Sequence, residues 1–229
     1  MIYKILATGS DGNATIVNGY SLIDCGVPYK AIEHYAQDLR LVFLTHIHGD
    51  HFNAATIKKL AFVRPSLRWV CCEWLVEALL DAGVKTTQID VIRPGAWVAF
   101  EMGDVVYASP IELTHNVRNC GWRIVINEES LFYATDTGTL EGISVKGYDV
   151  YLVEANHTQA EIEAAVAAAQ ANGEFTYRLR AAENHLSEEQ ARDWLTENMA
   201  AYSVWVPMHG HREGGSNHAG TENAREEHY

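Results

Sequence analysis

The densest group of metal-binding side chains in this chain is Thr45-His46-Ile47-His48-Gly49-Asp50-His51-Phe52. We call residues 45–52 the metal loop. The loop directly follows the apolar run 41–44, which predicts a buried strand. Residues two apart in an extended chain point the same way, so His46 and His48 can bind one metal ion together. Gly49 permits a sharp turn that would direct Asp50 and His51 toward a second ion.

The ligand types in the metal loop indicate which metals it can hold. Imidazole nitrogen together with carboxylate oxygen suits zinc, manganese or iron, and does not suit calcium. The alternative is a polar loop in which the histidines have no common role. Four potential ligands so close together, placed directly after a core strand, favour the metal site. We therefore expect two divalent metal ions per chain, with zinc or manganese as the metals.

The composition is that of a soluble globular protein. The chain has 229 residues, of which 48% are hydrophobic and 21% are charged. No apolar run approaches the length of a membrane span, and residues 1–4 lead into a short strand and not into a signal peptide. The cysteines are Cys25, Cys71, Cys72 and Cys120, and their spacing indicates no disulfide framework. We therefore expect a cytoplasmic protein without a membrane partner.

The net charge of -13 lies mostly in the second half of the chain. Residues 1–130 hold 11 basic and 14 acidic side chains, a balance of -3, while residues 131–229 hold 6 and 16, a balance of -10. No basic stripe is visible of the kind that binds long nucleic acids. Bound divalent metals would offset part of the acidity locally. The charge pattern therefore leaves room for a small phosphodiester pocket but not for a broad nucleic-acid surface.

Strands and helices alternate along the chain, which indicates an α/β (α+β) fold. We expect one domain over residues 1–213 and a flexible tail over residues 214–229, which are rich in Gly, Ser, Asn and Glu. Asn18-Gly19 between two apolar runs predicts a tight hairpin. Side chains suited to start helices precede several helical segments. The expected helices are 29–37, 54–61 after Asn53, 73–82, one opening with the capping box Thr158 to Glu161, and one from Ser187 to Met199; the last strand is expected at 202–206.

Further acids and histidines stand at the ends of predicted strands. Asp24 and Asp136 each follow an apolar strand and precede a glycine, so either could form a turn or serve a site. Glu154 ends another strand. A lone histidine at a strand end, such as His115, is usually structural. Local sequence leaves both interpretations open for these residues.

The spacing His-x-His-x-Asp-His over residues 46–51 resembles the signature of the metallo-β-lactamase superfamily. The resemblance implies a four-layer αββα sandwich with two metal ions at one edge of two packed β-sheets. It also implies a ligand set drawn from the whole chain. The first metal would take His46, His48 and His115, and the second would take Asp50, His51, Asp136 and His209, with Asp136 able to contact both.

The resemblance also implies a role for Asp24 and leaves two histidines for the last ligand position. Asp24 would lie beneath the metals and hold a ligand histidine in place. Relatives usually present one histidine after the last strand, whereas this chain has His209 and His211. His209 is closer to the strand end and is preferred, and His211 is the alternative ligand.

Three other segments look like the YycJ/WalJ-type exonuclease branch of the superfamily and, more distantly, RNase Z. They are the opening Gly-Ser-x-Gly-Asn, which ends at Asn13, and residues 153–157 and 184–187. This resemblance implies that Asn13 and His157 support the site from behind the ligands.

In RNase Z-like enzymes, a histidine at the start of a late helix protonates the leaving oxygen and is oriented by a carboxylate. The resemblance makes His185 the general acid and Glu154 its partner, while Asp50 acts in catalysis as well as in metal binding. The alternative for His185 is a helix-entry histidine beside the cap residue Ser187.

These features together predict a metal-dependent hydrolase that activates water with two metal ions. We expect a phosphodiesterase or nuclease, with DNA, short oligonucleotides or another nucleotide phosphodiester as the substrate. The first alternative is a small-molecule hydrolase on the same fold, such as a lactonase, thioesterase or cyclic-nucleotide phosphodiesterase, which the acidic surface favours. The second is a metal-bearing protein that sequesters a nucleotide without turnover. The sequence does not indicate the oligomeric state.

Overall fold

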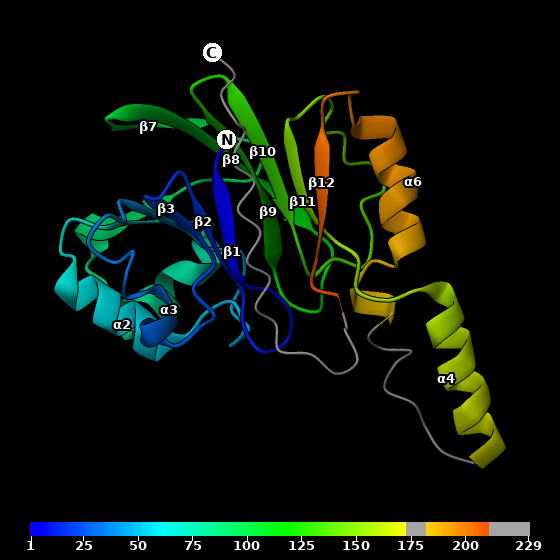
Figure 1. Cartoon of the computed structure of the whole chain (residues 1–229). Helices are drawn as coiled ribbons and strands as arrows, with labels where there is room; N and C mark the ends of the chain where they lie inside the picture. The colour runs from blue at the N-terminus through cyan, green and yellow to red at the C-terminus, as the bar shows by residue number, and fades with distance from the viewer. Residues whose placement is uncertain (173–181, 211–229) are drawn as a thin grey trace.

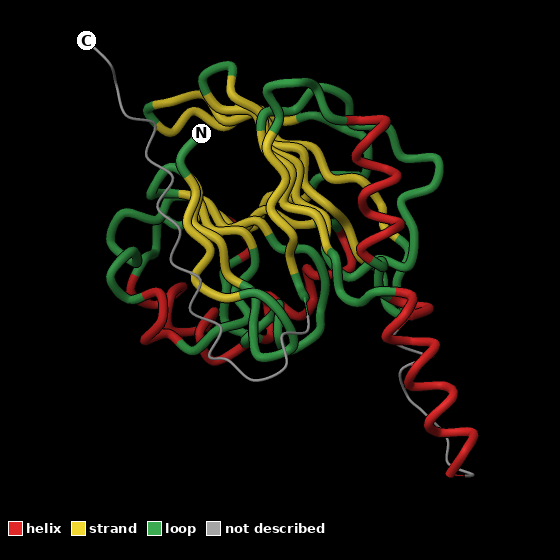
Figure 2. Tube along the Cα trace, turned by 45° about the vertical axis from the view of Figure 1, so that its right-hand side comes forward, coloured by secondary structure: helices red, strands yellow, loops and turns green. Residues whose placement is uncertain are grey.

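The computed structural model describes residues 1–172 and 182–210, and its centre is a pair of six-stranded β-sheets packed face to face (Figures 1 and 2). The first sheet has the spatial order β1 (Tyr3–Ala7), β2 (Ala14–Val17), β3 (Ser21–Ile23), β4 (Leu41–Phe43), β5 (Arg68–Cys71) and β6 (Ile89–Val91). The second has the order β12 (Val204–Met208), β11 (Val150–Glu154), β10 (Glu129–Ala134), β9 (Asn119–Ile126), β8 (Asp104–Leu113) and β7 (Val98–Met102).

Helices cover the outer faces of both sheets (Figure 1). The first sheet is covered by α1 (Tyr29–Ile32), α2 (Ala54–Val63) and α3 (Val76–Asp81), with short 3₁₀ helices at Glu73–Leu75 and Thr86–Gln88. The second sheet is covered by α6 (Glu188–Asn198). Helix α4 (Gln159–Asn172) projects away from the sandwich (Figure 2). Residues 159–171 of this helix include no buried side chain. These layers confirm the predicted four-layer αββα sandwich.

Three hydrophobic clusters hold the layers together because the central strands are buried on both faces. In β4, Phe43 packs between the sheets while Val42 packs under the helices. In β10, Tyr133 packs between the sheets while Phe132 contacts the α6 layer. Side chains alternate between the two faces of a strand, so each such strand stabilises two neighbouring layers.

Strand direction places the site at one edge of the sandwich. Strands β3 to β6 run parallel to one another in the first sheet, and β10 to β12 do so in the second. The carboxyl ends of parallel strands lie at the same edge of a sheet, where loops can converge. The metal loop follows β4, Glu154 ends β11, and His209 follows β12. Residues far apart in sequence therefore meet at this edge.

Most of the predicted helix and turn signals are confirmed. Asn53 caps α2 by accepting a hydrogen bond from the backbone N–H of Thr56. Ser187 opens α6 with a reciprocal capping box. Asn18 and Gly19 turn the β2–β3 hairpin with positive φ angles.

Three element boundaries differ from the prediction. The helix expected at 29–37 is α1 followed by tight turns, in which i to i+3 hydrogen bonds replace helical ones. The helix expected at 73–82 begins as a 3₁₀ turn, and the last strand starts two residues later than expected. In the described part of the chain, no helix has the length and apolar character that crossing a membrane requires.

Candidate metal centre

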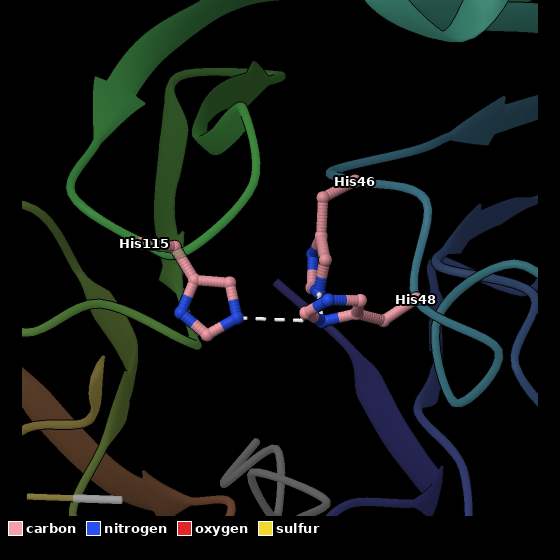
Figure 3. Close-up of side chains that lie close together, drawn as sticks. All are labelled: His46, His48 and His115. Atoms are coloured by element: carbon pink, nitrogen blue, oxygen red, sulfur yellow. Dashed lines mark hydrogen bonds between the residues drawn. The ribbon is translucent and has the colours of Figure 1, made fainter. Parts of the chain in front are cut away.

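The first ligand cluster is formed by His46 and His48 of the metal loop and His115 of the loop after β8 (Figure 3). Nε2 of His46 lies 3.2 Å from Nδ1 of His48, and Nε2 of His115 lies 3.3 Å from the same Nδ1. Two nitrogens bound tetrahedrally to one zinc ion at ~2.0–2.1 Å are roughly 3.3 Å apart. The three rings therefore have the spacing of ligands to a single ion.

In two of the three rings, the nitrogen that faces away from the cluster has a contact that orients the ring. Nδ1 of His115 lies 3.2 Å from the backbone carbonyl oxygen of Asn184. Nδ1 of His46 lies 3.0 Å from the hydroxyl of Thr45. Such contacts fix which nitrogen of an imidazole faces a metal.

Burial keeps two of these imidazoles neutral. It lowers the pKa of His46 to about 2, with a further contribution from the nearby His51 ring. Burial also lowers the pKa of His115 to about 4. Because a metal binds the neutral ring through its lone pair, these two histidines are ready to bind a cation at neutral pH.

The second ligand cluster contains Asp50, His51, Asp136 and His209. Nε2 of His51 lies 2.8 Å from Oδ2 of Asp136 and 3.6 Å from Oδ2 of Asp50. Nε2 of His209 lies 3.5 Å from Oδ1 of Asp136 and 3.7 Å from Oδ2 of Asp50. All of these atoms lie within reach of a common ion.

Two buried atoms of this cluster have no hydrogen-bond partner, namely Oδ2 of Asp136 and Nε2 of His209. The Asp136 oxygen is close to His51, but the geometry of that contact is not that of a hydrogen bond. Buried polar atoms without partners are costly, and a bound cation would satisfy both. The donor set of two imidazoles and two carboxylates fits zinc or manganese.

The imidazoles and carboxylates of the second cluster shift one another's pKa values. Burial by itself lowers the pKa of His51, but the carboxylates of Asp24 and Asp136 outweigh it and hold that pKa well above its usual value. Burial raises the pKa of Asp136, but the His51 ring outweighs this and keeps that pKa well below its usual value. Burial by itself would also lower the pKa of His209, but Asp50 and Asp136 outweigh burial and raise this pKa above its usual value. Without metal, this cluster therefore holds protons of a kind that His46 and His115 of the first cluster lack.

Asp24 lies under the centre, fully buried, and accepts four hydrogen bonds. Oδ1 accepts from the backbone N–H and the hydroxyl of Thr45, and Oδ2 accepts from Nδ1 of His51 at 2.7 Å and from the hydroxyl of Tyr133. Four donors offset the cost of burying a carboxylate. The contact with Nδ1 directs Nε2 of His51 toward the second cluster.

Three residues of the centre have a left-handed backbone. Asp24, Asp136 and His209 have φ angles of 58°, 56° and 55°. Asp and His are among the residues that adopt this conformation most readily, and such residues gather at functional sites. The amide of Asn119 donates to the carbonyl of Asp136 at 2.7 Å and so supports one of these turns.

His185 and Glu154 form a close pair at the edge of the second cluster. Nδ1 of His185 lies 2.5 Å from Oε1 of Glu154 and 3.5 Å from Oδ1 of Asp136. The other oxygen of Glu154 accepts from the backbone N–H groups of Thr137 and Leu186. Glu154 and His185 also fit a metal-ligand set with Asp136 and His209. Because both oxygens of Glu154 already accept hydrogen bonds, we interpret it as the orienting partner of His185.

The predicted supporting residues are Asn13 and His157, and they have different contacts. The amide nitrogen of Asn13 lies 2.8 Å from Nε2 of His51 and also donates to the backbone carbonyl of Asp50. Nδ1 of His157 lies 3.4 Å from the side-chain oxygen of Asn156. The alternative ligand His211 lies outside the described residues.

Sequence reasoning missed two residues that hold ligands. Asn156 places its side-chain nitrogen 3.1 Å from Nδ1 of His209 and donates to the backbone carbonyl of the same residue. Thr45 links Asp24 to His46 through its hydroxyl. Both residues sit next to predicted site residues in the sequence, which was the only available signal.

Comparisons with known proteins agree with this architecture. The family model described as Beta-lactamase superfamily domain matches residues 22–209. Among curated proteins, none matches the chain.

Three solved structures illustrate the shared fold. The metallo-beta-lactamase fold protein YhfI from Bacillus subtilis has a TM-score of 0.67 at 17% identity and covers 93% of this chain and 88% of its own. Human tRNase Z, short form, has a TM-score of 0.66 at 15% identity, covering 92% of each chain. A diphosphatase from the PhnP family has a TM-score of 0.58 at 16% identity, covering 92% of this chain and 87% of its own. At these identities the likeness shows the fold alone.

Proposed function

This chain belongs to the beta-lactamase superfamily, and from that premise we propose that it is a metal-dependent phosphodiesterase acting on DNA or short oligonucleotides. The observation that carries the proposal is the contact between His185 and Glu154 beside Asp136 and His209. Cleaving a phosphodiester expels an alkoxide, which needs a proton donor. Thioesters and activated esters expel more stable anions and depend less on such a donor. A carboxylate-held imidazole beside the ligand clusters therefore favours phosphodiester chemistry.

The residues present fit a pair of divalent metal ions. His46, His48 and His115 would hold one ion, and Asp50, His51, Asp136 and His209 would hold the other. When bound, such a pair lowers the pKa of water and offsets negative charge on the phosphate.

The pair of His185 and Glu154 can supply the proton that the leaving oxygen needs. His185 directs Nδ1 to Glu154, which leaves Nε2 to donate a proton to the leaving oxygen. The buried carboxylate stabilises the protonated imidazolium. Glu154 is itself held by two backbone N–H groups, so the pair is oriented before substrate binds.

Two similarities support this choice of substrate. Human tRNase Z and the diphosphatase, which share the fold, are by their names enzymes that act on tRNA and on diphosphates. The segments around Asn13, Glu154 and His185 resemble the YycJ/WalJ-type branch, and this resemblance adds an exonuclease activity to the proposal.

A small-molecule hydrolase is the second candidate, favoured by the net charge of -13. Salt separates the two functions. Turnover of a nucleic acid should fall as salt rises, because cations compete for the phosphates. Turnover of a lactone or thioester should barely respond.

The decisive experiment is hydrolysis of bis-p-nitrophenyl phosphate and of a labelled oligonucleotide by metal-free protein, before and after adding zinc or manganese. We expect metal-dependent cleavage of both, and no cleavage by a folded Asp50→Ala variant. Failure on both substrates with two metals bound would overturn the proposal and lead to lactones and thioesters. Tight nucleotide binding without product would instead indicate a sequestering protein.

A further inference from the structure

A groove of about 410 Å³ lies beside the first ligand cluster. We call it the side groove, and its lining residues are Ile47, Trp74, Glu77, Ala78, Asp81 and Arg118. Ile47 stands between the ligands His46 and His48 in the metal loop. Arg118 follows His115 by three residues, in the same β8–β9 loop. Ile47 and Arg118 therefore connect the groove to the two segments that carry the first cluster, and its other walls come from the 3₁₀ helix Glu73–Leu75 and from α3.

One wall of the side groove is a fixed planar stack. The indole Nε1 of Trp74 donates to the backbone carbonyl of Thr45 at 3.3 Å. The guanidinium of Arg118 lies over this indole, 4.4 Å from the ring centroid, and is held by Glu73 at 3.0 Å. Ile47 is 42% exposed and adds apolar surface. Flat rings such as nucleobases stack on tryptophan and on arginine planes.

The charge of the side groove limits what else can enter it. Glu77 and Asp81 are exposed and lie one turn apart on α3. Glu73 and Glu112 both contact Arg118 and offset its positive charge, so the two carboxylates that line the groove are not balanced by a free cation there. A phosphate in this groove would be repelled. Carboxylates only accept hydrogen bonds, so they suit a neutral ring that carries amino or imino N–H groups.

We propose that the side groove binds the base of a nucleoside attached to the scissile phosphodiester and rejects a further phosphate on that nucleoside. This inference rests on the proposed function and narrows its substrate class. The substrate is a nucleotide diester with one phosphate-free nucleoside, found either in a cyclic nucleotide or at the end of a short oligonucleotide. A long polyanion running through the groove is excluded.

Binding of adenosine alone tests the stacking wall without catalysis. We expect ligand-observed NMR to detect adenosine binding to the metal-free full chain, and Arg118→Ala to weaken it at least about fivefold. Arg118→Lys keeps the charge but loses the plane, and it should weaken binding similarly. No binding, or binding unchanged in both variants, would overturn the inference whatever the enzyme hydrolyses.

Kinetics test the rejection of a second phosphate. For the metal-loaded enzyme, we expect the KM of a dinucleotide to rise at least about fivefold when its groove-side nucleoside carries a terminal phosphate. The double variant Glu77→Lys/Asp81→Lys should abolish this difference. The matched control Asp193→Lys/Glu197→Lys makes the same charge change four residues apart on α6, and should preserve it.

Two comparisons separate the outcomes. The control variant Asp193→Lys/Glu197→Lys lies outside the groove and should keep wild-type turnover of bis-p-nitrophenyl phosphate, which shows that this charge change leaves the enzyme intact. Adenosine binding without hydrolysis of any phosphodiester would sink the proposed function and leave the groove assignment standing. If the enzyme hydrolyses the dinucleotides but Glu77→Lys/Asp81→Lys leaves the ratio of KM values with and without the terminal phosphate unchanged, the groove assignment fails and the proposed function stands. Comparing a cyclic nucleotide with the dinucleotide shows which source of the nucleoside the groove prefers.

Discussion

At the scale of single residues, the two ligand clusters differ in the protons they hold before metal binds. Burial keeps His46 and His115 neutral, with pKa values of about 2 and about 4. Neighbouring carboxylates hold the pKa of His51 well above its usual value and also raise that of His209. Metal must displace protons from the second cluster but not from these two residues of the first.

This difference predicts stepwise metal loss on acidification. Lowering the pH from 8 to about 5.5 should remove the second metal ion before the first, because protons compete for His51 and His209 of the second cluster, whereas burial keeps His46 and His115 of the first neutral. Metal content after dialysis at each pH measures this. His209→Ala removes one of the two protonated imidazoles and should make the loss of the second ion less steep in pH, and His115→Ala should leave that loss unchanged. Simultaneous loss of both ions would contradict the prediction.

The same protonation has a definite sign for the stability of the metal-free protein. His51 has a raised pKa, so its stabilisation is fully present below its ordinary pKa of about 6.5 and is lost as pH rises through the folded value. Asp136 has a lowered pKa, so its stabilisation is present above about 3.8 and is lost as pH falls. Urea unfolding of metal-free protein should therefore show lower stability at pH 9 than at pH 6. Replacing His51 with Gln should flatten this dependence.

His185 offers a prediction about leaving groups. His185→Ala should slow cleavage of a dinucleotide, which expels a poor alkoxide, by about 10²–10⁴-fold. Turnover of bis-p-nitrophenyl phosphate should fall by less than about tenfold, because its leaving group needs no proton. Rates on both substrates at saturating metal provide the test. Equal losses on both would remove His185 from the acid role.

At the scale of elements, the metal loop is held against the turn after β3. The N–H of Cys25 donates to the carbonyl of His51, and the N–H of Asn13 donates to the carbonyl of Asp50. Gly26 lies so close to this loop that a Cβ there would sit 1.7 Å from the backbone oxygen of Asp50. Gly49, within the loop, has open space around it and lacks a positive φ. The close approach that requires glycine is therefore at Gly26, outside the loop.

Gly26→Ala and Gly49→Ala form a matched pair that tests this packing. Gly26→Ala should lower the free energy of unfolding by about 1–3 kcal/mol, because the metal loop must shift. It should also weaken metal binding. Gly49→Ala should change the free energy of unfolding by less than about 1 kcal/mol and keep both metals. Urea unfolding and metal content measure both effects, and equal effects in the two variants would refute this account.

At the scale of the whole molecule, the centre joins the two halves of the sandwich. The first cluster takes His46 and His48 from the first sheet and His115 from the second. The second cluster combines the metal loop with Asp136 after β10 and His209 after β12. A metal in either cluster therefore ties the two sheets together at their shared edge.

Metal removal should consequently lower thermal stability. An ion that binds only the folded state at 1,000 times its Kd adds about 4 kcal/mol, which for a domain of this size raises Tm by about 8–16 °C. Calorimetry with and without chelator measures the shift. His185→Ala keeps every ligand and should show the same shift. An unchanged Tm with metal demonstrably bound would contradict a site that links the sheets.

The sequence by itself determined the fold class, the metal loop and the helix starts, because these depend on local patterns. Continuous apolar runs specify strands buried on both faces, as the neighbours Val42 and Phe43 show. Asn53 and Ser187 begin their helices through contacts within three residues. The density of ligands in residues 45–52 indicates metal binding without any tertiary information.

Only the tertiary structure decided which distant residues complete the centre. His115 and Asp136 are ambiguous in sequence, and they join the clusters because carboxyl ends of strands from two sheets meet at one edge. Asn156 holds His209 and His157 contacts Asn156, and a local pattern does not reveal such a series of contacts. The side groove likewise brings Trp74 and Arg118 together from different sheets. Local sequence encodes which side chains are available, whereas burial and strand pairing decide which of them meet.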